Sequence, residues 1–264
     1  MAQAPVSSNG PTVDIAGATH PGLVRTSNED AYIIMGKETL PGWCSAVAGV
    51  FDGVGGRANG GQASIRAARY LQELVRAPAL RRGPPGPLEN LVPNLLRALH
   101  HMLKTDGLVE PALHAMATTA TIALLVQSRP DTLWLGHVGD SPAFRIHHGQ
   151  ISKLMVEDSL VSSLVRDGLI TAEQAMGHPR RHVITQALGY GVEVTPHVAA
   201  HQVAPGDRVL LCTDGLTNMV PAQRIGEIVA AQPPEMSCAM LINAANAAGG
   251  WDNITVVALG FNAP

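Results

Sequence analysis

The strongest constraint on the fold is a set of apolar, strand-like segments that each meet an acidic residue beside Gly or Asn. The clearest are AVAGVFDG, RVLLCTDG and WDNITVVAL, which place Asp52, Asp214 and Asp252 at segment boundaries. An Asp at the end of a buried strand is held in place, and a following glycine lets the backbone turn away. Strand ends that gather in a folded sheet therefore bring carboxylates together, and carboxylates repel one another unless a cation lies among them.

Two further motifs have the same form: Glu29-Asp30 in RTSNEDAY and Gly139-Asp140 in LWLGHVGDSP. Ligand sets made only of oxygen atoms indicate a hard divalent cation, Mg²⁺ or Mn²⁺. A single Asp-Gly pair is equally typical of an ordinary turn. The combination of motifs, rather than any one of them, predicts a metal site.

Composition excludes several classes of protein. Of the 264 residues, 46% are hydrophobic and 15% charged, which is typical of a globular chain. A net charge of -3 gives no basic surface for nucleic acid. The three cysteines are widely spaced, no apolar run reaches the ~20 residues of a membrane span, and the first residues lack a signal-peptide pattern. We expect a cytoplasmic protein that binds neither nucleic acid nor membrane.

The order of elements predicts the fold class. Strand patterns cover 13–19, 31–35, 43–51, 118–126, 132–138, 142–147, 151–154, 192–197, 207–213 and 253–260, with a turn at 129–131. Helical patterns cover 60–76, 88–104, 158–168, 171–176, 221–231 and 235–248. Strands that follow one another in runs favour an α+β fold with antiparallel sheets. No linker divides the chain, so residues 1–264 are expected to form one domain, with 1–11 as a flexible tail.

Six motifs between His20 and Val257 together resemble the metal-dependent protein phosphatase family (type 2C, PPM) in its bacterial form. In chain order they are RTSNED, FDGVGG, TTAT, GDS, TDGLT and WDNITV. The resemblance implies a central sandwich of two antiparallel β-sheets flanked by pairs of α-helices, a four-layer αββα arrangement. It also implies hydrolysis of phosphoserine and phosphothreonine in proteins, with a metal-bridging water as nucleophile, and a flap-like helical insert at 153–195.

The resemblance assigns roles to individual residues. Two Mn²⁺ or Mg²⁺ ions are expected, with Asp52 as the bridging ligand and catalytic residue. Arg25 is expected to bind the substrate phosphate and to act in catalysis. The remaining implied metal ligands are Glu29, Asp30, the backbone carbonyl of Gly53, Asp214 and Asp252.

Four positions depart from the family pattern. Val54 stands where many members carry a His proposed as general acid, and Pro142 stands where Arg is usual. Residues 157–159 read Glu-Asp-Ser instead of Asp-His-Ser. Asn218 replaces an Asp of a third metal site, so Asp140, Asp214 and Asn218 would form only a weak site for a third ion.

The sequence also suggests supporting roles for some residues, the expected partners, and two alternative functions. We interpret Gly55-Gly56 as backbone flexibility beside Asp52, and Asn253 as a support for the Asp252 loop. The expected partners are phosphorylated proteins made by a Ser/Thr kinase, and the protein is expected to be a monomer. One alternative is a catalytically silent phosphoprotein-binding module on the same fold. Another is a metal-dependent hydrolase of small phosphoesters.

Overall fold

A computed structural model describes residues 10–54 and 59–264 and contains two five-stranded sheets whose neighbouring strands all pair antiparallel. The first sheet has the order β2 (Asp30–Gly36), β3 (Cys44–Asp52), β4 (Ala120–Val126), β5 (Arg129–Val138) and β8 (His197–Gln202). The second has the order β1 (Thr12–His20), β10 (Ile254–Asn262), β9 (Arg208–Cys212), β6 (Ala143–His147) and β7 (Gln150–Lys153).

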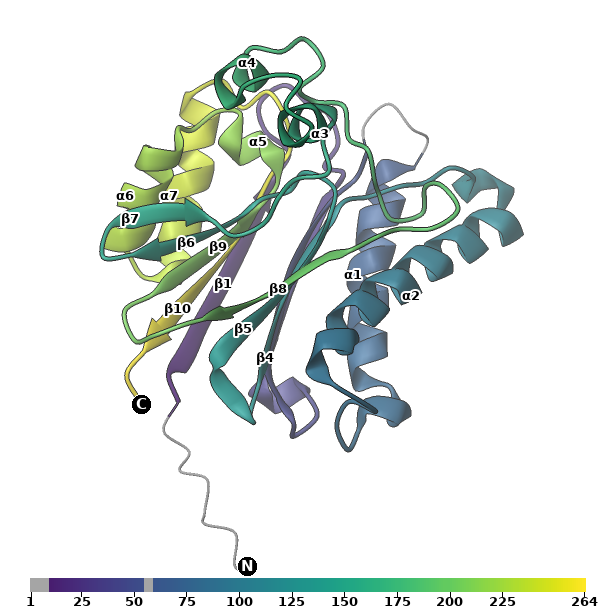
Figure 1. Cartoon of the computed structure of the whole chain (residues 1–264), viewed down its shortest axis with the longest axis vertical. Helices are drawn as coiled ribbons and strands as arrows, with labels where there is room; N and C mark the ends of the chain where they lie inside the picture. Colours follow the sequence, from purple (N-terminus) through teal and green to yellow (C-terminus); the bar gives the residue numbers. More distant parts are fainter. Residues whose placement is uncertain (1–9, 55–58) are drawn as a thin grey trace, which may run out of the picture.

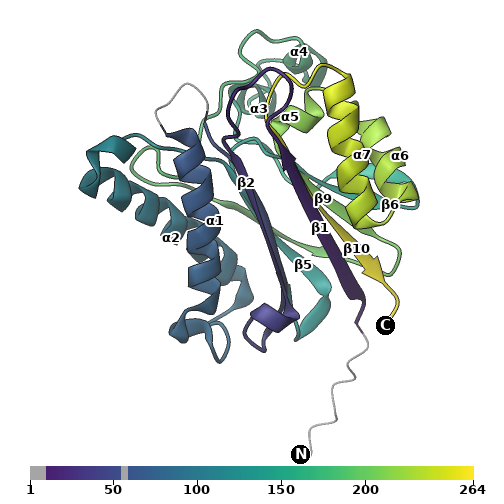
Figure 2. The same cartoon turned by 180° about the vertical axis from the view of Figure 1, so that it is seen from behind.

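Helices cover the outer face of each sheet, as Figures 1 and 2 show. The long helices α1 (Gly60–Arg76) and α2 (Leu88–Val109) pack on the first sheet. The helices α6 (Ala222–Ala231) and α7 (Pro234–Ala247) pack on the second. The predicted α+β sandwich with flanking helix pairs is therefore confirmed.

The strand β3 shows why the sandwich forms from this sequence. Its side chains are buried on both faces, because one face meets α1 and α2 and the other meets the second sheet. Phe51 lies in the helix-facing core, and Val50 lies between the sheets with Leu211 of β9. A strand covered on both sides needs a continuous apolar run rather than an alternating one. The strand ends at Asp52, where the polar end of the sandwich begins.

Several predicted boundaries are wrong, among them two in the first sheet. The strand expected at 192–197 lies at His197–Gln202 instead, and Val192 is 78% exposed in a loop with Gly189 and Gly191 at positive φ. β8 is an edge strand bonded only to β5 among the described elements, so its sequence carries little apolar signal. The turn expected at 129–131 lies earlier, because β5 already begins at Arg129.

The insert at 153–195 contains two short helices, α3 (Leu160–Arg166) and α4 (Ala172–Met176). Ser159 caps the first, and Thr171 and Gln174 cap the second reciprocally. Both helices lie at the end of the sandwich where α5 (Asp214–Thr217) follows β9 (Figure 1).

Two expectations from the sequence fall partly or wholly outside the described residues. These are the flexible tail, of which residues 1–9 are not described, and the Gly55-Gly56 pair. Among the helices of the described chain, none is long and apolar enough to cross a membrane.

Candidate functional site

The predicted acidic residues gather at one end of the sandwich. Asp52 ends β3, Asp214 begins α5 directly after β9, Asp140 follows β5, and Asp252 precedes β10. These four side chains line one cavity of about 580 Å³, together with Arg25 and Asn218. The topology thus brings together residues that are up to 227 positions apart in the chain.

Asp30 lies beneath this cavity, directly opposite Asp52 in the β2–β3 pairing. Its side chain is only 6% exposed. The Oδ2 atom accepts a hydrogen bond of 2.8 Å from Thr213, whereas Oδ1 has no hydrogen-bond partner in the described part of the chain. A buried carboxylate oxygen without a partner is costly, so its surroundings favour a proton or a cation.

Burial and mutual repulsion raise the pKa values of Asp30, Asp52, Asp140 and Asp214. Burial, followed by the charges of Asp214 and Asp252, raises the pKa of Asp30 to about 7. Burial and Asp214 raise the pKa of Asp140 to about 8. The pKa of Asp52 lies well above its usual value, because of burial and then Asp30 and Asp214. Carboxylates that raise one another's pKa values in this way are stabilised by a bound cation.

The donor chemistry fits a hard divalent cation, because the cavity presents carboxylate and amide oxygens. The side chains are not in a finished ligand arrangement. In residues 10–54 and 59–264, no three His, Cys, Asp or Glu side chains are placed to hold a metal ion. Two of the carboxylates are bonded to protein side chains. Asp252 forms a 2.8 Å ion pair with Arg25, and Asp214 accepts a 3.0 Å hydrogen bond from Asn218.

Glu29 and Gly53 are not among the residues that line this cavity. The backbone oxygen of Glu29 accepts bonds from the Gly53 amide at 3.1 Å and from the Ser64 hydroxyl at 2.5 Å. A Cβ atom on Gly53 would lie 2.4 Å from the Gly60 carbonyl carbon, so only glycine allows this close approach of β3 to α1. The Glu29 carboxylate lies beside Gly60, next to the first turn of α1.

Asn253 holds the loop that carries Arg25 and Glu29. Its Oδ1 accepts the Glu29 amide at 2.7 Å, and its Nδ2 donates to the carbonyls of Pro21 at 2.9 Å and Ser27 at 2.8 Å. Asn253 was expected to support the Asp252 loop, but its side chain instead supports the loop that carries Arg25. Arg25 itself is about half exposed and points to Asp252 at the cavity edge.

Asp158 holds the Gly139-Asp140 turn in place. This role was not predicted from the sequence. Its Oδ2 accepts the Gly139 amide at 3.0 Å, and its Oδ1 accepts from Gln186 at 2.9 Å and lies 2.8 Å from His197 Nε2. The side chain is 6% exposed. It ties both ends of the insert to the turn that presents Asp140, and only the departure at 157–159 marked this position in the sequence.

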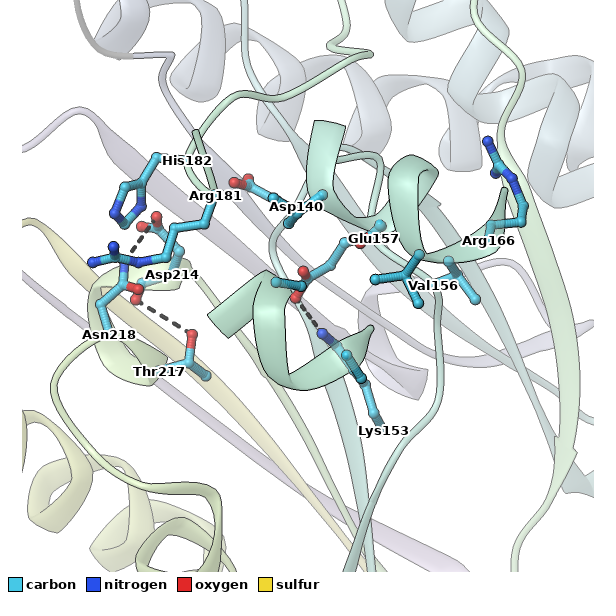
Figure 3. A pocket seen from close by; sticks show the side chains of 15 residues that line it. Asp140, Lys153, Val156, Glu157, Arg166, Arg181, His182, Asp214, Thr217 and Asn218 are labelled. Atoms are coloured by element: carbon cyan, nitrogen blue, oxygen red, sulfur yellow. Dashed lines mark hydrogen bonds and ion pairs between the residues drawn. The ribbon is translucent and has the colours of Figure 1, made fainter. Parts of the chain in front are cut away.

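Arg181 and His182 were also missed as site residues. Both come from the loop after α4 and line the carboxylate cavity. Figure 3 shows both side chains near Asp214 and Asn218. The residue His182 is exposed. Only the fold of the insert shows that this surface borders the acidic cluster.

Comparison with known proteins agrees with this geometry. The family profile described as Protein phosphatase 2C matches residues 24–233. The chain is 37% identical over 241 residues to the serine/threonine protein phosphatase PstP of Mycobacterium tuberculosis, covering 89% of this chain and 42% of PstP. It is 33% identical over 244 residues to the serine/threonine phosphatase stp of Listeria monocytogenes, covering 90% and 92%.

A solved structure of the catalytic domain of PstP, in complex with 2 manganese ions, superposes with a TM-score of 0.77. It is 31% identical and covers 95% of this chain and 98% of that one. This chain therefore belongs to the protein phosphatase 2C family. It spans less than half of the full length of PstP, 42%.

Proposed function

We propose that this protein is a metal-dependent phosphoprotein phosphatase that hydrolyses phosphoserine and phosphothreonine. The observation that carries the proposal is the cluster of Asp52, Asp140, Asp214 and Asp252 around one cavity, with an unpartnered oxygen of Asp30 beneath it. Such a group of carboxylates needs positive charge, and two divalent cations would supply it. Family membership supports the same chemistry.

We propose the following ligands for two Mn²⁺ or Mg²⁺ ions. Asp52 would contact both, the Gly53 carbonyl would add an oxygen, Asp214 and Asp252 would hold the first, and Glu29 would face the second with Asp30 nearby. Asp140 and Asn218 would form a weaker third position with Asp214. When bound, the ions lower the pKa of water and neutralise the charge of the phosphate.

The residues of this chain would position the substrate. The Arg25 guanidinium would leave Asp252 and bind two phosphate oxygens, because its planar fork matches that geometry. The pair that it leaves is solvent-exposed, and such pairs contribute at most about 1 kcal/mol. Asn253 would hold the Arg25 loop in position beside the carboxylates through its bonds to Pro21 and Ser27.

We further propose that residues 1–264 act as one domain and as a monomer in the cytoplasm. Its substrates would be proteins phosphorylated by a Ser/Thr kinase. The insert at 153–195 would serve as a flap, because Arg181 and His182 from this segment border the acidic cavity.

Hydrolysis of a phosphothreonine peptide with and without Mn²⁺ tests the proposal. Asp52→Ala should lower kcat by about 10³-fold, because it removes charge that acts directly at the reacting phosphate. Asp131→Ala is the matched control, since Asp131 lies at the opposite end of β5 from Asp140 and is exposed. Full activity after chelation would refute metal dependence, and peptide binding without turnover would indicate a silent binding module.

A further inference from the structure

A second cavity lies against the carboxylate cavity, on the side of the insert. It has a volume of about 590 Å³ and shares Asp140, Asp214 and Asn218 with the acidic site, together with Arg181 and His182. Apart from Thr217, the remaining lining comes from the insert, where Figure 3 shows Val156 among the charged residues Lys153, Glu157 and Arg166. We call it the flap pocket, and its apolar lining is Val156, Val161, Val165, Ala172 and Ala175.

Most of the apolar lining is open to solvent, and only Val161 among the five residues is buried. Val156 is 59% exposed, and Val165 is half-buried on α3. None of the three core clusters among the described residues contains either side chain. An exposed apolar wall beside a polar site is typical of a binding surface.

Part of the charge in the flap pocket is compensated within its own lining. Lys153 forms an ion pair with Glu157 within the lining, so these two charges compensate each other. Arg166 donates a 3.3 Å hydrogen bond to Ser163 and lies at the far side of the pocket from Asp214 (Figure 3). The valine and alanine wall of the pocket suits an aliphatic side chain.

Building on the proposed function, we infer that the flap pocket binds an apolar side chain of the phosphoprotein substrate, a few residues from the phosphorylated Ser or Thr. The argument for this occupant is continuity, since five lining residues belong to both cavities. A substrate whose phosphate lies at the carboxylates must pass its neighbouring residues along this wall. An extended chain advances about 3.3 Å per residue, so positions about two to four residues away reach it.

The test uses the Mn²⁺-loaded protein and a set of phosphothreonine peptides. The reference peptide has Ser at the four positions on each side of phosphothreonine, and each other peptide carries one Leu in place of one Ser. Leu at one or two positions on the same side should raise kcat/KM about tenfold over the reference, as is typical for filling an apolar subsite. Equal kcat/KM for all Leu peptides and the reference would overturn the inference and leave the phosphatase activity intact.

Two variants locate the effect in the pocket. Val165→Ser and Val156→Ser should each bring the Leu-to-Ser ratio of kcat/KM toward one. Leu169→Ser is the matched control, because Leu169 is a 68% exposed apolar residue of the same insert that does not line the pocket. Thermal unfolding of each variant checks that the insert stays folded. A ratio that persists in both valine variants would overturn the assignment to this pocket.

A binding experiment separates the flap-pocket proposal from the phosphatase proposal. If no peptide is hydrolysed, peptide affinities are measured by fluorescence polarisation with the same set. Tighter binding of the Leu peptides would support the flap pocket while the phosphatase proposal fails. Equal affinities would contradict both.

Discussion

Substitution of Asn253 by Ala should destabilise the protein strongly, although the side chain is predicted to touch neither metal nor substrate. Asn253 is 6% exposed and makes three hydrogen bonds to the loop that carries Arg25: from the Glu29 amide, and to the carbonyls of Pro21 and Ser27. Each bond contributes about 1 kcal/mol to stability, so removing the set costs about 3 kcal/mol. For a protein of this size the loss corresponds to a drop in Tm of roughly 6–12 °C.

Urea unfolding followed by circular dichroism measures this loss directly. Asn262→Ala is the matched control, because Asn262 makes one exposed side-chain bond, to Asp14 at 2.7 Å, and should lose about 1 kcal/mol or less. Asn253→Ala should also raise KM for a phosphopeptide, since the loop then holds Arg25 less firmly. A loss of stability no greater than that of the control would show that the loop does not depend on these bonds.

Three further predictions follow from the charges of the site. Arg25→Ala should raise KM for phosphopeptides by at least about tenfold, because it removes a bidentate phosphate contact; Arg25→Lys should recover only part of this, and an unchanged KM in Arg25→Ala would exclude Arg25 as a phosphate ligand. Asn218→Asp should lower the Mn²⁺ concentration for half-maximal activity, because a carboxylate binds hard cations better than an amide; an unchanged Mn²⁺ dependence would show that a third ion does not limit turnover. In metal-free protein, urea unfolding should show stability falling as pH rises from 6 to 9. Asp30 and Asp140, with folded pKa values of about 7 and 8, bind protons more tightly than the unfolded chain with its pKa near ~4, so the stabilisation present at low pH is lost as pH rises through the folded values. Asp140→Asn should flatten that profile, and an equally steep profile in this variant would refute the assignment.

The strand ends could be predicted from the sequence because their signals are local. An apolar run that stops at Asp52 or Asp214 indicates both a buried strand and the point where it leaves the core. Since β3 and β9 both end at the same side of the sandwich, predicting the strands was enough to predict the cluster. The apolar face of α1 was predictable for the same reason, since Ala63, Ala67 and Leu71 recur at helical spacing.

Contacts between distant segments could not be predicted in this way. Asp158 acts through bonds to the Gly139 amide, Gln186 and His197, and no periodicity links these positions. The exposed Arg181 belongs to the site only because the insert folds back over the carboxylates. The edge strand β8 was placed too early because none of its residues is fully buried and its sequence has no apolar pattern.

The central claim is that the carboxylates of this cavity bind divalent cations together, with Asp52 shared between two ions. Isothermal titration calorimetry of Mn²⁺ into the metal-free protein tests it most directly, because it counts ions independently of catalysis. The account predicts two ions per chain for the unaltered protein, loss of this binding in Asp52→Asn, and no change in Asp131→Asn. Binding in Asp52→Asn with the same number of ions and the same affinity as in the unaltered protein would contradict it.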